Sequence, residues 1–248
     1  MIQERKSPFT ARSVVASALL GMEPPELPVA QLVRLTGLFG INPNRTRVAL
    51  SRMVAAGEAT TDGAGVYRLA GHLRERQARQ AASRTGVTVP FSGQWHLAVV
   101  MTKGSTAEIR TARRGALAYA RLAELREGVW MRPDNVALRL HDGLASDVEL
   151  MATRPEAPAR LAATLWDLEA WAERAQQLID ALEGLSPDTA SALAPGFELS
   201  ASVLRHLQAD PLLPEELLPP SWPGARLRAD YDRWDARYRT TLRAWSRS

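Results

Sequence analysis

The sequence predicts an α+β protein with an N-terminal winged helix-turn-helix, a central ferredoxin-like domain and a helical C-terminal domain. Three observations predict this fold class. Three helical segments precede a glycine-rich hairpin, a strand, helix, strand, strand order follows, and helical periodicity returns near the end. We place the winged helix-turn-helix at residues 1–72, a basic linker helix at 73–92, the ferredoxin-like domain at 93–155 and the helical domain at 156–248.

The composition is that of a globular protein. The chain has 248 residues, 46% of them hydrophobic, and no cysteine. Such a content suffices for packed cores, and the lack of thiols excludes disulfides and thiolate metal sites. The sequence has neither an apolar run long enough to span a bilayer nor a hydrophobic secretory segment after MIQERKSPFTARS, so we expect a cytoplasmic protein without a membrane partner.

The charge is uneven along the chain. Residues 1–90 hold 12 Lys and Arg against 6 Asp and Glu, whereas the remainder holds 19 against 21. A basic front joined to a mildly acidic back indicates a first domain that binds a polyanion.

The first two helices are marked by apolar periodicity and by proline. Residues 10–20 predict one helix, which the prolines of MEPPELP stop, and residues 28–39 predict a second, which ends at Gly40. Only Gly40, Ile41 and Asn42 separate it from a third helix. A connection this short forces a sharp angle, as in a helix-turn-helix.

The third helix, residues 42–56, starts with Asn42 as N-cap and Pro43 at the first helical position. Helical spacing predicts a core face and an opposite outer face. The core face holds Thr46, Leu50, Met53 and Val54, and the outer face holds Arg45, Val48, Ala49, Arg52 and Ala56.

The outer face has the chemistry that a DNA major groove accepts. Guanidinium groups pair with guanines or phosphates, and small side chains permit close approach. We expect phosphate or guanine contacts from Arg45, Arg47 and Arg52, with base-edge contacts from Asn44, Val48 and Ser51. The alternative is an ordinary solvated helix with surface arginines.

Residues 58–61 and 66–69 flank the turn Asp62-Gly63-Ala64-Gly65 and predict a β-hairpin, the wing. Arg68 is the only cation of this wing and a further candidate for DNA contact. Residues 71–86 predict a polar, basic helix, most simply a solvated connector.

Buried-strand and helical patterns alternate in the central part. Residues 95–102 predict a strand, 107–125 a long helix, 129–132 and 136–140 two strands, and 148–153 another. In the C-terminal part, residues 158–184 predict one long helix, residues 197–207 a second, and residues 210–224 a proline-rich segment that wraps over a core. The last helix carries an apolar stripe of Leu227, Tyr231, Trp234, Tyr238, Leu242 and Trp245.

An enzyme is the main alternative, in particular a metal-dependent nuclease that acts through the central domain. Such cleavage needs carboxylates that hold a metal, and the strand at 95–102 has none at its end, where Lys103 follows. The histidines His72, His96, His141 and His206 are scattered, and no glycine-rich phosphate loop is present. We therefore expect no catalytic residue, no metal and no cofactor.

The chain resembles the PaaX-type transcriptional repressors of aromatic acid catabolism. The likeness lies in RTRVALSRMVAAG (45–57), a wing ending in VYRL, REGVWMRPDN (126–135) and, most specifically, DPLLPEELLPPSWPG (210–224). It implies a winged helix, a ferredoxin-like domain similar to that of CRISPR-associated endoribonucleases, and a helical C-terminal domain. It also implies a homodimer that an aryl-coenzyme A thioester releases from double-stranded operator DNA.

An acyl-coenzyme A effector would need an apolar pocket and phosphate-binding cations. Trp95, Trp130 and the aromatic stripe are candidates for the pocket, and Arg110, Arg113 and Arg114 for the phosphates. The alternative is that these aromatic residues form a core or a dimer interface and that the arginines are solvated. The C-terminal helices are our first expectation for the dimer interface.

Overall fold

The computed structural model describes residues 9–102, 104–138, 140, 144 and 146–247. The chain forms two compact units, each built from segments distant in sequence. The first unit contains residues up to Thr85, Ala175–Gln208 and the chain from Ala225 onward. The second unit contains Gly86–Arg174 and Ala209–Gly224.

The N-terminal part of the first unit contains the predicted helices and hairpin. The helices are α1 (Ala11–Leu20), α2 (Val29–Gly37) and α3 (Pro43–Ala55), and the hairpin consists of β2 (Ala59–Thr61) and β3 (Val66–Leu69). Residues 22–28, expected only to interrupt two helices, contain a third strand, β1 (Glu26–Pro28), which pairs antiparallel with β3. Proline is tolerated at such a sheet edge because no hydrogen-bond donor is needed there.

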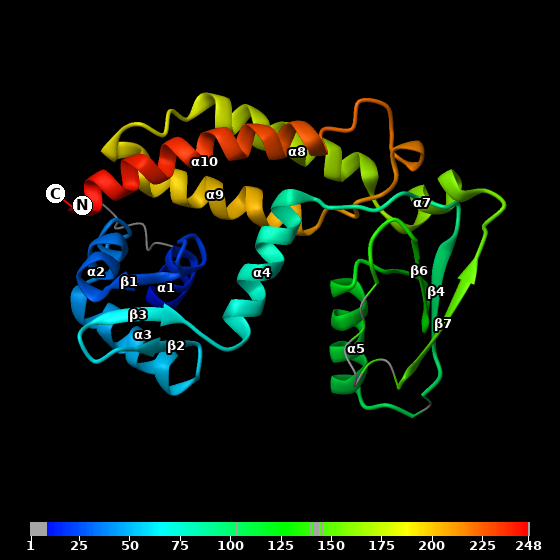
Figure 1. The fold of residues 1–248 in the computed structure, drawn as a ribbon, viewed down its shortest axis with the longest axis horizontal. Coiled ribbons are helices and arrows are strands. Elements are labelled where there is room, and N and C mark those ends of the chain that lie inside the picture. Colours follow the sequence, from blue (N-terminus) through cyan, green and yellow to red (C-terminus); the bar gives the residue numbers. More distant parts are fainter. Residues whose placement is uncertain (1–8, 103, 139, 141–143, 145, 248) are drawn as a thin grey trace, which may run out of the picture. The chain divides into compact units, whose positions relative to one another are not determined.

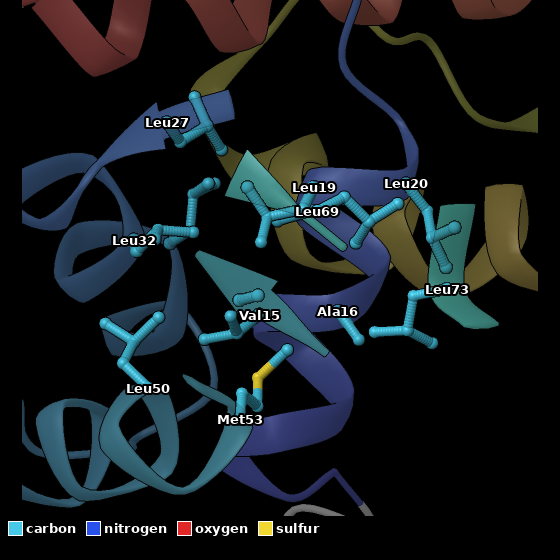
Figure 2. Packing of buried hydrophobic residues seen from close by; sticks show 13 residues of the cluster. Val15, Ala16, Leu19, Leu20, Leu27, Leu32, Leu50, Met53, Leu69 and Leu73 are labelled. Carbon is cyan, nitrogen blue, oxygen red and sulfur yellow. The ribbon is translucent and has the colours of Figure 1, made fainter. Parts of the chain in front are cut away.

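One apolar core holds this part together (Figure 2). Val15 and Leu19 from α1, Leu32 from α2, and Leu50 and Met53 from α3 have no exposed side-chain surface. The three helices therefore share one core, and α3 packs into it through the face that the sequence predicted.

The rest of the first unit is helical. It comprises α4 (His72–Thr85), the later part of α8 (Leu168–Gly184), α9 (Leu193–Gln208) and α10 (Gly224–Arg247). In Figure 1, α9 and α10 run side by side. A Cβ atom added at Gly196 of α9 would lie 2.6 Å from Cε2 of Tyr238 on α10. The glycine permits this close approach, and the predicted stripe on α10 is buried at Leu227, Tyr231 and Trp234.

The second unit is built on an antiparallel sheet in the order β5 (Ala123–Arg126), β6 (Val129–Pro133), β4 (Trp95–Val100) and β7 (Val148–Thr153). The helix α5 (Ala107–Tyr119) connects β4 to β5 and covers one face through Leu117. This strand order and the β-α-β start correspond to a ferredoxin-like arrangement. The α+β class is confirmed.

Three predicted elements differ from the structure. The helix expected at 107–125 ends at Tyr119, and β5 follows a turn at Arg121, whose φ is 60°. No strand occurs at the described positions within 136–140. The helix expected at 158–184 is two helices, α7 (Pro158–Leu165) and α8, because Trp166 is extended and packs against Trp95.

The proline-rich segment 210–224 covers a core, as expected. Leu213 and Leu217 are buried in one cluster with Trp95, and Trp222 stacks on Trp171 with ring centroids 4.5 Å apart. Its only described regular element is a short 3-10 turn, Glu215–Leu217. Among the described residues, no helix combines the length and apolar character that crossing a bilayer requires.

Candidate nucleic-acid interface

The helix α3 is held at its start and along its buried face. Asn42 Oδ1 accepts a hydrogen bond from the Arg45 backbone N–H at 2.9 Å, and Pro43 occupies the first helical position. The buried hydroxyl groups of Thr46 and Thr36 lie 2.7 Å apart and join α3 to α2. This bond satisfies two polar groups inside an apolar core, and it fixes the orientation of α3 against α2.

The turn between α2 and α3 uses Gly40 with a φ of 70°, a conformation that favours glycine. The Ile41 backbone N–H donates to the Thr36 carbonyl oxygen at 3.2 Å, and Ile41 is buried. The short connection between α2 and α3 is therefore held by a hydrogen bond and an apolar anchor.

The outer face of α3 presents every side chain predicted to contact DNA from this helix. All six are exposed: Asn44, Arg45, Arg47, Val48, Ser51 and Arg52. Within the described part of the chain, none of the three arginine side chains makes a hydrogen bond or an ion pair. Ala49, which helical spacing placed on the outer face, is instead buried at 9% exposure, so that assignment was wrong. Its small side chain lies at the edge of the core, where the helix meets its neighbours.

The wing turn is shaped by its acidic residue. Asp62 Oδ1 accepts hydrogen bonds from the backbone N–H groups of Ala64 at 2.8 Å and Val66 at 3.1 Å. These bonds, the one from Val66 first, hold the pKa of Asp62 below its usual range.

Arg68, the wing cation, already has a partner. Its Nε donates to Glu26 Oε2 on β1 at 2.5 Å. The pairing arises because β1 and β3 place Glu26 directly opposite Arg68. Sequence reasoning missed it, since the partner lies in the segment expected only to interrupt the helices. A DNA contact by Arg68 stays a prediction, and it would compete with this ion pair.

A buried carboxylate ties the wing to α1. Glu58 is 7% exposed, accepts a hydrogen bond from Arg12 Nε at 2.8 Å, and lies 3.8 Å from His72 Nε2. The hydrogen bond from Arg12 is the main cause that lowers the pKa of Glu58. The sequence analysis did not select Glu58. The one feature that could have indicated it is the position of a charged residue between Gly57 and a strand.

Four of the five predicted effector-binding residues meet at one pocket of the second unit. Arg110, Arg113, Arg114 and Trp130 line a cavity of about 440 Å³ between α5 and the sheet. Two of the arginines already face carboxylates. Arg114 pairs with Glu124, and Arg113 Nε lies 3.8 Å from Asp147 Oδ2.

Trp95 does not reach that pocket. Alternate residues of a strand point to opposite faces, and Trp130 lies opposite Ala98, on the face that α5 covers. Trp95 lies three positions before Ala98, therefore on the other face, and packs fully buried against Trp166. The aromatic stripe on α10 is likewise core, and burial raises the pKa of Tyr231 and Tyr238.

The histidines do not gather in the described structure. His96 is half-buried, and desolvation lowers its pKa. His141 lies outside the described residues, and His72 and His206 lie on α4 and α9. In the part of the chain that the structure describes, no three His, Cys, Asp or Glu residues are grouped so that they could hold a metal ion.

Comparisons with known proteins agree with this arrangement. Residues 10–73 match the family described as "PaaX-like protein", and residues 161–247 match "PaaX-like protein C-terminal domain". A solved structure, described as "Uncharacterized protein Rv0674 from Mycobacterium tuberculosis", is 41% identical, with 96% of this chain and 99% of that chain covered and a TM-score of 0.77. No curated protein matches the chain.

Proposed function

The chain belongs to the PaaX-like family, and from this premise we propose that it is a transcriptional regulator that binds double-stranded operator DNA through α3. The observation that carries the proposal is the exposure of the unpaired side chains of Arg45, Arg47 and Arg52 within the described structure. They are exposed on one rigid helix and have no partner within the described structure. Guanidinium groups in this state can pair with phosphates or guanine edges without first breaking an ion pair.

The test is an electrophoretic mobility shift with the protein's own operator. If Arg45 and Arg52 contact bases, Arg45→Ala and Arg52→Ala should each cost about 1–3 kcal/mol of binding free energy. Arg74→Ala is the matched control, because Arg74 is exposed on α4 and lies outside the outer face of α3. Undiminished binding by both α3 variants would remove the assignment of this face.

The finer proposal is repression by a homodimer. One winged helix contacts only a short half-site, so a two-fold pair would double the contacts and match a palindromic operator. Sedimentation of the full chain at micromolar concentration should give twice the monomer mass of 27.2 kDa. A monomer that still binds the operator tightly would contradict this part of the proposal.

Release from DNA by an acyl- or aryl-coenzyme A thioester completes the proposal. It is supported by family membership and, in the second unit, by the pocket that Arg110, Arg113, Arg114 and Trp130 line. Phenylacetyl-coenzyme A added to the protein–DNA complex should release the operator, whereas free coenzyme A should leave it bound. Retention of the operator with every acyl thioester would discard the effector.

A further inference from the structure

The first unit contains a cavity of about 260 Å³ lined by four helices, α1, α4, α9 and α10. Part of its lining is apolar and comes from all four helices, through Leu20, Leu73, Leu204 and Leu242, and from Met22 just after α1. An apolar lining with a few polar groups is the usual character of a small-molecule site. Tyr231 and Tyr238, from the aromatic stripe that the sequence offered for a pocket, are part of its lining, whereas the other predicted effector-binding residues are not.

Two cations at this cavity have no partner among the residues that the structure describes. Arg76 on α4 and Arg205 on α9 line it, both are exposed, and neither makes a hydrogen bond or an ion pair with any described residue. The other two arginines in the lining are engaged: Arg12 with Glu58, and Arg239 with Asp235 at 2.8 Å. Two unpaired guanidinium groups beside an apolar cavity favour a ligand that carries an anionic group.

The charge of the lining distinguishes this cavity from the pocket of the second unit. There, Glu124 and Glu127 are part of the lining, and Arg114 is already paired with Glu124. Here, the one carboxylate in the lining is Asp235, which is 3% exposed and is neutralised by Arg84 and Arg239, with N–O distances of 2.7 and 2.8 Å. The first-unit cavity therefore presents net positive charge to a ligand.

We propose that this cavity binds a small amphipathic organic anion, with its apolar body among the leucines and its anionic group at Arg76 and Arg205. The volume lies just below the range of about 300–1,000 Å³ for pockets of drug-sized ligands. This volume is suited to one aromatic ring or a short acyl chain. The ligand is either a free carboxylic acid, whose carboxylate meets Arg76 and Arg205, or a larger conjugate whose neutral acyl end enters the cavity while its phosphates meet the same two arginines.

Occupation of the cavity would act on α4 and on α1, which shares its core with the DNA-binding helix α3. Arg239 on α10 donates a hydrogen bond to the Gly21 carbonyl oxygen at the end of α1, and Arg84 on α4 pairs with Asp232 of α10 at 2.5 Å. A ligand in the cavity touches the same four helices, so it favours whichever packing of α1 and α4 on α10 accommodates it. This consequence rests on the proposed regulator function, whereas the binding itself does not.

The test is calorimetric titration of the full chain, without DNA, with phenylacetate, octanoate, phenylacetyl-coenzyme A and free coenzyme A. We expect at least one of the first three to bind and free coenzyme A to bind at least about tenfold more weakly. Binding of a free acid or of the thioester supports the proposal when the cavity variants described below weaken it. Thioester binding that those variants leave unchanged belongs to the pocket of the second unit and overturns the proposal. Absence of binding by all three, or equal binding of free coenzyme A, overturns it.

Two variants locate the site. Because charge-assisted hydrogen bonds are strong, Arg76→Ala combined with Arg205→Ala should weaken binding by about tenfold or more, while Arg74→Ala on the same α4 leaves it unchanged. Ala201→Trp, at a half-buried position of the lining, should abolish binding by filling the cavity. Circular dichroism and thermal unfolding check that each variant is folded. Unchanged affinity in the double variant overturns the assignment, and so does unchanged affinity in a folded Ala201→Trp variant.

A mobility shift without ligand separates this inference from the proposed function. If the protein binds an acid but no operator, the regulator proposal fails and the site stands. If it binds the operator but none of the probes, the site fails and the regulator proposal stands.

Discussion

The side-chain amide of Asn135 donates a hydrogen bond of 2.8 Å to the carbonyl oxygen of Leu212, 77 positions further along the chain. Asn135 is 2% exposed, and its Oδ1 accepts a bond from Arg132 Nη2 at 3.3 Å. The motifs REGVWMRPDN and DPLLPEELLPPSWPG therefore meet in a buried polar network. Two of the segments that carry the family resemblance thus stabilise the second unit.

Arg132 is the centre of this network and has no exposed surface. Its guanidinium donates to the carbonyl oxygens of Pro133 at 3.0 Å and Arg121 at 3.3 Å. Burial, and then the positive charge of Arg121, lower the pKa of Arg132 to about 10. The group stays charged at neutral pH because backbone carbonyls replace the water it loses.

Removal of the Asn135 amide should destabilise the second unit. Asn135→Ala leaves the Leu212 carbonyl and one Arg132 N–H group buried without a partner, at a cost of about 1–3 kcal/mol for each such group. Urea unfolding followed by circular dichroism measures the change. Asn44→Ala, at an exposed position of α3, is the control and should stay within about 0.5 kcal/mol of the parent. Equal stability of the two variants would show that the network contributes nothing.

The Arg12–Glu58 pair should make stability depend on acid pH. The folded pKa of Glu58 is lowered, so its contribution is fully present above the unfolded pKa of about 4.3 and is lost as pH falls through the lower folded pKa. Urea midpoints measured from neutral pH down to about pH 3 should fall less steeply for Glu58→Gln than for the parent. Parallel pH profiles would contradict the assignment.

Gly196 should not tolerate a side chain. Gly196→Ala places a methyl group 2.6 Å from the Tyr238 ring, and the overpacking should cost about 1–3 kcal/mol. Thermal unfolding gives the measurement. Gly184→Ala is the matched control, because a Cβ at Gly184 meets nothing within 4 Å. A stable Gly196→Ala variant would mean that α9 and α10 can separate without loss.

The wing cation should become available when its partner is neutralised. Glu26→Gln removes the charge that holds Arg68, so operator affinity should rise and the slope of log affinity against log salt should steepen by about 0.9 if Arg68 gains one phosphate contact. Fluorescence anisotropy across a salt series measures both quantities. In the Glu26→Gln background, a further Arg68→Ala change should reverse the gain. A slope that Glu26→Gln leaves unaltered would exclude Arg68 from the interface.

Sequence patterns correctly predicted the features that depend on a single helix. The N-cap at Asn42, the buried side of α3 at Thr46, Leu50 and Met53, and the apolar stripe of α10 follow from residue type and helical spacing, because each depends on a few neighbouring residues. The exposure of Arg45, Arg47 and Arg52 follows for the same reason.

Such patterns did not predict contacts between segments that are distant in the sequence. The break between α7 and α8 at Trp166 depends on packing against Trp95. The ion pair of Arg68 depends on Glu26, in a strand formed by residues 26–28. The arginine-lined cavity requires four helices to pack together. By itself, the sequence determined the α+β class and the basic outer face of α3. Only the tertiary structure decided which cations remain unpaired, since pairing depends on distances in space between residues far apart in the chain.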